Sequence, residues 1–186
     1  MSLLYFTSET IVWQEVPNET SLAFLIAGCP LRCQGCHSAE SWREGTGKLL
    51  SETYLRQRLA QYQGLISCVL FMGGEWQPMA LKALLGIVQS AGLKTCLYTG
   101  LEYEELCRLD ADLCKALTFL KTGRWIAALG GLDSPYTNQR LIDLRNGRLL
   151  NSLFWRKKNE GTKTVLDMPK ETRALSKQST GLFLSQ

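Results

Sequence analysis

The chain has 186 residues, the length of one ordinary domain. Hydrophobic residues make up 45% and charged residues 20%, a composition that favours a packed globular protein over a disordered or fibrous one. No apolar run approaches the roughly 18 residues that a membrane-spanning helix needs, and the first residues lack the basic start of a secretory signal. We therefore expect a cytoplasmic protein without a membrane partner.

The net charge of +4 comes from the end of the chain. Residues 156–186 carry seven Lys or Arg against three Asp or Glu, whereas residues 1–155 carry fourteen of each sign. A balanced domain lacks the basic surface that binds a phosphate backbone, so nucleic acid is not an expected partner. The sequence predicts one domain over 1–155 and a basic tail or peripheral extension over 156–186.

Strands and helices are predicted to alternate through the middle of the chain. Continuous apolar runs predict strands at 21–28, 65–72, 94–98 and 117–120. Capping residues and helical spacing of apolar residues predict helices at 51–63, 78–92 and 102–109. This alternation implies crossover connections and a mostly parallel sheet in an α/β fold.

A C-terminal hairpin is predicted over residues 141–150. The dipeptide Asn146-Gly147 supplies the two positive φ angles that a type I′ turn requires, and apolar residues flank it on both sides.

Unusual residues follow three of the predicted strands. A cysteine cluster follows Gly28, Gly73-Gly74-Glu75 follows the second strand, and Thr99-Gly100 follows the third. Because binding sites form beyond the carboxyl ends of parallel strands, these three segments are expected to share one pocket.

The chain contains seven cysteines, an odd number that argues against a disulfide framework in an intracellular protein. Four stand singly among apolar neighbours and are interpreted as small core residues: Cys68, Cys96, Cys107 and Cys114. The other three fall within eight residues: Cys29, Cys33 and Cys36.

Several cofactors suit part of this cluster. Structural zinc needs four ligands, and the single histidine, His37, adjoins Cys36, so the two rarely reach one ion together. The stretch 33–37 spells the C-x-x-C-H pattern of c-type haem attachment, but such proteins are usually exported and Cys29 is left unexplained. A thioredoxin-like pair at Cys33 and Cys36 explains neither Cys29 nor Gly-Gly-Glu. These alternatives stay open, but each accounts for less of the sequence than an iron–sulfur cluster.

Three thiolates are natural ligands for an iron–sulfur cluster. The spacing C-x3-C-x2-C allows one loop to hold three corners of a cubane and leaves one iron free for another ligand. Gly28 and Gly35 permit close approach of the backbone to such a cluster.

The spacing Cys29-x3-Cys33-x2-Cys36 resembles the signature of the radical S-adenosylmethionine (SAM) superfamily. Together with Trp42, Gly-Gly-Glu, Tyr-Thr-Gly, the stretch 121–125 and the stretch 130–140, it resembles the activating proteins of anaerobic ribonucleoside-triphosphate reductases. The similarity covers about residues 5–150. It implies an incomplete (βα) barrel of the radical SAM type, followed by the hairpin and the tail.

The resemblance also implies the cofactors, a [4Fe-4S] cluster and SAM, and the residues that bind them. The three loop cysteines, Cys29, Cys33 and Cys36, would hold the cluster. The methionine ammonium of SAM would be bound by Gly73, Gly74 and Glu75. The backbone around Gly35, Cys36 and His37 would lie beside the adenine, and Thr99 would contact the carboxylate.

The implied activity is that of an activating enzyme, a radical SAM oxidoreductase. Such enzymes cleave SAM reductively to a 5′-deoxyadenosyl radical, which takes a hydrogen atom from a glycine of the partner reductase to leave a glycyl radical. A low-potential donor such as flavodoxin or ferredoxin would supply the electron. Two features depart from the family pattern: Trp76 stands where Pro is usual, and the stretch 121–123 lacks the usual acidic residue.

Two alternative functions remain. One is a non-catalytic iron–sulfur or zinc protein that serves electron transfer or assembly. The other is a radical SAM enzyme that acts on a different protein or peptide.

Overall fold

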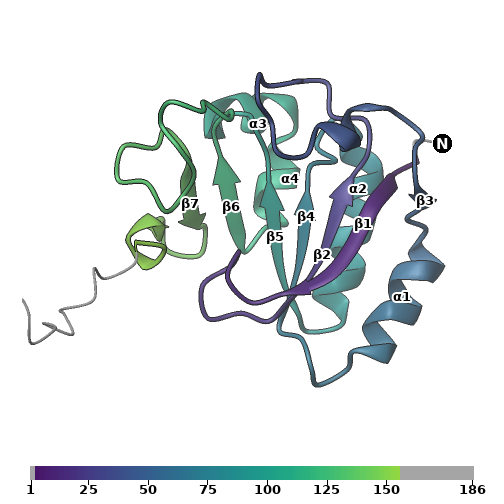
Figure 1. The fold of residues 1–186 in the computed structure, drawn as a ribbon. Coiled ribbons are helices and arrows are strands. Elements are labelled where there is room, and N and C mark those ends of the chain that lie inside the picture. Colours follow the sequence, from purple (N-terminus) through teal and green to yellow (C-terminus); the bar gives the residue numbers. More distant parts are fainter. Residues whose placement is uncertain (1–2, 156–186) are drawn as a thin grey trace, which may run out of the picture. The chain divides into compact units, whose positions relative to one another are not determined.

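A mixed sheet of eight strands is the framework of residues 3–155, the part of the chain that the computed structural model describes (Figure 1). Its strand order is β3-β1-β2-β4-β5-β6-β7-β8. The strands are β1 Tyr5–Val12, β2 Ser21–Ile26, β3 Lys48–Leu49, β4 Cys68–Met72, β5 Lys94–Tyr98, β6 Phe119–Thr122, β7 Arg140–Asp143 and β8 Arg148–Leu149. The four central strands, β2, β4, β5 and β6, run parallel, and all their carboxyl ends lie at one edge of the sheet.

Helices connect the parallel strands, as the sequence predicts. They are α1 Glu52–Gln61, α2 Pro78–Ser90, α3 Tyr103–Leu109 and α4 Ala111–Lys115, with 3-10 turns η1 Ala39–Trp42 and η2 Asn151–Leu153. The Ser51 hydroxyl caps α1 by accepting the Tyr54 N–H at 3.1 Å, and Pro78 occupies the first turn of α2, where its missing N–H costs no helical bond. The predicted 102–109 helix is α3, whose N-cap is Glu102.

The sheet differs from the sequence prediction in two respects. It is mixed rather than mostly parallel, because β1 and β3 flank one side of the parallel strands and β7 and β8 flank the other, all in antiparallel pairs. Within residues 3–155 it does not close into a barrel, since β3 and β8 form two separate edges. The α/β class is confirmed, whereas the sequence analysis missed β1 because residues 7–10 of this strand are polar.

The C-terminal hairpin is present, but its turn is not type I′. β7 and β8 pair antiparallel with Asp143 opposite Arg148, which leaves a loop of four residues instead of two. Of the Asn146-Gly147 pair, only Gly147 has a positive φ, +70°. The Asn146 side chain instead accepts the Arg148 N–H at 2.9 Å and closes the loop locally.

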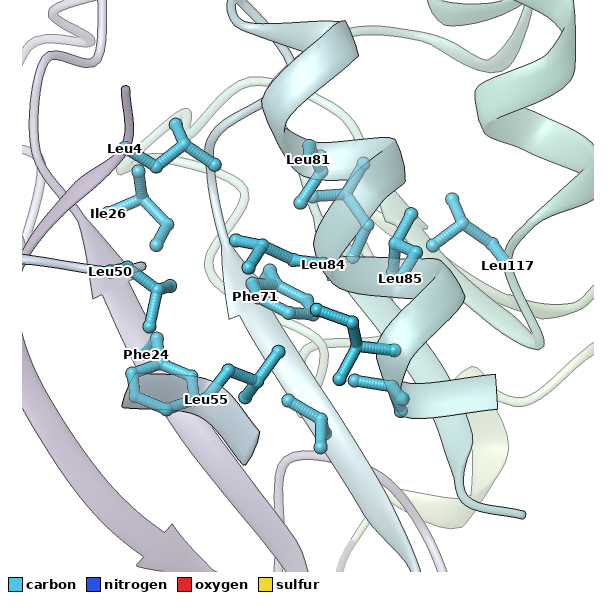
Figure 2. Packing of buried hydrophobic residues seen from close by; sticks show 14 of the residues in the cluster. Leu4, Phe24, Ile26, Leu50, Leu55, Phe71, Leu81, Leu84, Leu85 and Leu117 are labelled. Carbon is cyan, nitrogen blue, oxygen red and sulfur yellow. The ribbon is translucent and has the colours of Figure 1, made fainter. Parts of the chain in front are cut away.

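Apolar side chains cover both faces of the sheet. On one face, β2 and β4 pack against α1 and α2, as Figure 2 shows for Phe24, Phe71, Leu55 and Leu84. A smaller cluster on the other face includes Cys68 and lies under the segment after β1 and the chain around η2. Burying these side chains supplies the main force that folds the chain, at roughly 25 cal/mol per Å² of apolar surface.

The four cysteines outside the loop differ in burial. Cys68 and Cys96 are fully buried, which confirms the core prediction, and burial raises the pKa of the Cys68 thiol to about 12. Cys114 is 8% exposed, whereas Cys107 is only half-buried.

None of the helices within residues 3–155 combines the length and apolar character that crossing a membrane requires. The basic extension predicted over 156–186 lies outside the described residues.

Candidate functional site

The segments that follow the four parallel strands meet around one cavity at the carboxyl edge of the sheet. In Figure 1 the loop after β2 crosses this edge above the strand ends. The cavity measures about 180 Å³. Its polar and sulfur-bearing lining comes from every one of these segments and includes Cys29, Cys33, Cys36, Glu75, Thr99 and Lys121. The sequence analysis predicted that these segments share one pocket, and the cavity confirms this. They converge because β2, β4, β5 and β6 run parallel and end at the same edge.

The cysteine loop is held by backbone hydrogen bonds rather than by regular structure. The Gly28 and Cys29 N–H groups donate to the Ser41 carbonyl at 2.7 and 3.3 Å, which ties the start of the loop to η1. The Cys36 N–H donates to the Cys33 carbonyl at 3.1 Å, and the Ser38 N–H donates to the Cys36 Sγ at 3.4 Å. An N–H that donates to a cysteine sulfur also stabilises the thiolate form that binds iron.

All three loop cysteines are half-buried free thiols. Burial raises the pKa of Cys29, and the nearby Glu75 carboxylate raises it further, while hydrogen bonds from backbone N–H groups lower it. Within residues 3–155, no three Cys, His, Asp or Glu side chains converge on the position of one metal ion. In a cubane, however, each thiolate binds a separate iron, so cluster ligands do not need to meet at a point.

Glu75 is a buried carboxylate with one bonded oxygen and one free oxygen. Its side chain belongs to a residue that is 3% exposed, and Oε1 accepts the Thr99 hydroxyl at 2.7 Å. Thr99 in turn accepts the Leu101 N–H at 3.0 Å, which fixes the direction of its hydroxyl. Oε2 is buried without a hydrogen-bond partner. Burial raises the pKa of Glu75, and the Thr99 hydrogen bond partly opposes this shift.

Lys121 places an ammonium group in the same cavity. It lies at the end of β6, where its Nζ is 5.8 Å from the centre of the Tyr98 ring and donates to the Gly123 carbonyl at 3.4 Å. Burial lowers the pKa of Lys121 to about 8, although Cys33, Cys36 and Glu75 act in the opposite direction. No carboxylate within residues 3–155 forms an ion pair with it, so this cation faces the thiols and Glu75 without a direct salt bridge.

Two tryptophans, Trp42 and Trp125, line the cavity together with the cysteine loop. The Trp125 ring lies 4.4 Å from the His37 ring, centre to centre, and its indole N–H is buried without a partner. The indole N–H of Trp42 is also buried and unpartnered. A buried N–H normally finds an acceptor, so both groups are available to an acceptor in the cavity.

The predicted residues divide into a lining group and a flanking group. The cavity lining contains six of them: Cys29, Cys33, Cys36, Gly73, Glu75 and Thr99. Gly35, His37 and Gly74 are not among the lining residues, although each adjoins one in the sequence. The carbonyl of Gly74 already accepts the Gln77 N–H at 3.0 Å.

The site predicted from the sequence did not include the lining residues Tyr98, Lys121, Trp125 and Gln139. A charged residue directly after the apolar pair that begins β6 was the available signal for Lys121. Gln139 had no such signal, because its contact with the Gly123 carbonyl, at 3.2 Å, joins segments 16 residues apart.

Larger hollows occur elsewhere in residues 3–155 but lack this chemistry. One of about 370 Å³ lies between α1 and α2, and another of about 580 Å³ lies beside β3 and α2. Neither contains a cysteine, and mostly aliphatic side chains line both. We therefore place the functional site at the smaller cavity.

An α/β fold with three thiols gathered beside buried charges at the carboxyl edge is the arrangement expected of an iron–sulfur protein. Residues 20–141 match the family described as the 4Fe-4S single cluster domain, and the chain belongs to this family. No curated protein matches the chain.

Proposed function

We propose that the protein is a radical SAM activating enzyme that forms a glycyl radical on an anaerobic ribonucleoside-triphosphate reductase. The observation that carries this function is the cavity, where the three loop cysteines lie beside Gly73, Glu75 and Thr99. Membership of the 4Fe-4S single cluster family supports the cluster, and the motifs that resemble the activating proteins support the reaction. The parallel strands β2, β4, β5 and β6 with their helices would form the incomplete barrel.

Cys29, Cys33 and Cys36 would hold three irons of a [4Fe-4S] cluster. Their half-buried thiols and the Ser38 N–H bond to the Cys36 sulfur suit this role. When bound and reduced, the cluster would supply the one electron that reductive cleavage of SAM needs, and SAM would supply the radical that takes the glycine hydrogen.

Glu75 would bind the methionine ammonium of SAM through its free oxygen, Oε2. The Thr99 hydroxyl holds the other oxygen and so sets the orientation of the carboxylate. A charge-assisted bond from the ammonium would satisfy an oxygen that the described residues leave without a donor. The Gly73 carbonyl would accept a further N–H of the same ammonium.

Lys121 would supply a positive charge to this site. A cluster with three thiolates, together with the carboxylate of SAM, adds negative charge beside a buried ammonium, and their attraction offsets the cost of burying it. The cavity is smaller than the roughly 300–1,000 Å³ typical of ligand pockets.

The first test is SAM cleavage by the full chain after anaerobic reconstitution with iron and sulfide and reduction with dithionite. We expect 5′-deoxyadenosine and methionine in equal amounts, and none from Cys33→Ala. A cluster that is reduced normally without cleaving SAM would overturn the enzymatic function and leave electron transfer or assembly.

The second test adds the reductase. Electron paramagnetic resonance should then show a glycyl radical that requires SAM, the reduced cluster and the partner. SAM cleavage without a glycyl radical would keep the radical SAM class but assign a different protein or peptide as the substrate.

A further inference from the structure

Two cysteines outside the cavity face each other across a helix junction. Cys107 lies in α3 and Cys114 in α4, and their Sγ atoms are 2.8 Å apart. Within residues 3–155, no other two cysteine sulfurs form a hydrogen-bond contact. Neither lines the cavity of the proposed cluster, so the pair is independent of the site described above.

Hydrogen bonds and an ion pair hold the junction that brings them together. Asp110 ends α3 and caps α4 by accepting the Asp112 and Leu113 N–H groups, both at 3.0 Å. Its second oxygen forms an ion pair with Lys82 of α2 at 2.6 Å. These bonds fix how α3 and α4 meet, and so they keep the two thiols in contact. Forming an S–S bond of about 2.05 Å needs the sulfurs to approach by less than about 1 Å.

The two thiols differ in access. Cys107 is half-buried and touches the side chain of Tyr103, which is 40% exposed. Cys114 is 8% exposed, and burial together with Cys107 raises its pKa to about 12. Because Cys107 is the more exposed of the two thiols, an oxidant in solution reaches it first.

We propose that Cys107 and Cys114 are a redox modification site, which a low-molecular-weight disulfide oxidises reversibly to an intramolecular disulfide. The Cys107 thiolate attacks the oxidant, forms a mixed disulfide and releases one thiol. The Cys114 sulfur then attacks the Cys107 sulfur, its proton leaves to solvent, and the second thiol departs. One oxidant disulfide is reduced to two thiols, and the two cysteines lose two electrons and two protons.

The bond would connect α3 and α4 next to the functional site. Glu105 of α3 forms a bidentate ion pair with Arg124, at 2.9 and 3.2 Å, and Arg124 precedes the cavity residue Trp125. Oxidation would thus restrain the helix that anchors one side of the loop after β6.

The sequence makes this bond easy to detect, because Arg108 lies between the two cysteines. Trypsin would cleave after Lys94, Arg108 and Lys115 to release the peptides 95–108 and 109–115. The second peptide contains Cys114 as its single cysteine. The two remain joined only if Cys114 is bonded to Cys107 or to Cys96, and fragmentation of the joined peptide distinguishes these cases.

The experiment uses the full cluster-loaded chain, equilibrated anaerobically with reduced and oxidised glutathione at about 1 mM each, then alkylated and digested. We expect more than half of Cys114 in the Cys107-linked peptide and its release by excess reduced glutathione. Cys114→Ala should retain glutathione on Cys107, and the control Cys68→Ala should form the link as the wild type does. Free thiols at both positions, glutathione on wild-type Cys107 without the link, or a Cys96–Cys114 link would each overturn the assignment.

Discussion

Thr95 and Thr99 lie on β5 and just after it, at opposite ends of the same strand, and both are buried. The Thr95 hydroxyl donates to the Ala116 carbonyl and accepts the Thr118 N–H, both at 2.9 Å, and it lies 3.4 Å from the Thr118 hydroxyl, so its partners are neighbouring parts of the fold. The Thr99 hydroxyl donates to Glu75, whose other oxygen has no partner. A threonine at the amino end of β5 therefore stabilises the fold, whereas the threonine after its carboxyl end orients the Glu75 carboxylate for binding.

The two ends of the sheet also differ in how their charged residues are paired. At the amino end, the buried Glu19 pairs with Lys94 at 2.5 Å. At the carboxyl end, Glu75 and Lys121 line one cavity but form no ion pair within the described residues. Glu19 also has one buried oxygen without a partner, but within the described residues only Glu75 and Lys121 line a cavity together with the loop cysteines, which is typical of a binding site.

The largest expected effect separates loop cysteines from core cysteines. Cys33→Ala should lose most of its cluster iron after reconstitution while its circular dichroism stays that of the wild type, because the loop contributes little to the core. Cys68→Ala should keep the iron but lose about 1 kcal/mol of unfolding free energy, since it leaves a small core cavity. Iron per chain and urea unfolding measure the two effects. Equal loss of iron in both variants would contradict this division of the cysteines.

Removing the charge of each buried glutamate should affect different properties. Glu75→Gln should weaken SAM binding by about 10- to 100-fold, the equivalent of a charged hydrogen bond of roughly 1.5–3 kcal/mol. Glu19→Gln should bind SAM normally but lose stability, because Lys94 loses its partner. Equilibrium dialysis of the cluster-loaded proteins gives the affinities. Unchanged affinity in Glu75→Gln would remove this residue from the SAM site.

Lys121 should give the apoprotein a distinctive pH dependence. Its pKa is about 8 in the folded chain against 10.5 for an ordinary lysine, so between these values the unfolded state binds more protons. The unfolding free energy of the wild type should therefore rise relative to Lys121→Met as the pH increases from 8 to 10.5, by about 2 kcal/mol in total. Urea unfolding of both proteins across this range measures the difference. If the unfolding free energies of the two proteins changed with pH in the same way, the folded state would not lower the pKa of Lys121.

The smallest effects should come from the two threonines. Thr95→Val should lose about 1 kcal/mol of unfolding free energy without a change in SAM affinity, because it removes backbone hydrogen bonds. Thr99→Val should weaken SAM binding about fivefold, since Glu75 loses the group that orients it. Titration of SAM and urea unfolding of each variant provide both values. A change in SAM affinity for Thr95→Val that matches Thr99→Val would contradict the division between the two ends.

The sequence by itself determined the elements that depend on neighbours along the chain. Ser51 and Pro78 mark helix starts because caps act within one turn, and apolar runs mark the central strands because those strands are buried on both faces. The spacing of Cys29, Cys33 and Cys36, and their position after β2, likewise required no tertiary information.

Only the tertiary structure decided the features that join distant segments. β1 is a strand because it pairs with β2 and β3, although its middle is polar. The burial of Lys121, the Thr99–Glu75 bond and the contact between Cys107 and Cys114 all depend on where neighbouring strands and helices place them. Local sequence patterns do not predict such contacts, because the burial and the pKa of a side chain depend on atoms that are close in space but distant in sequence.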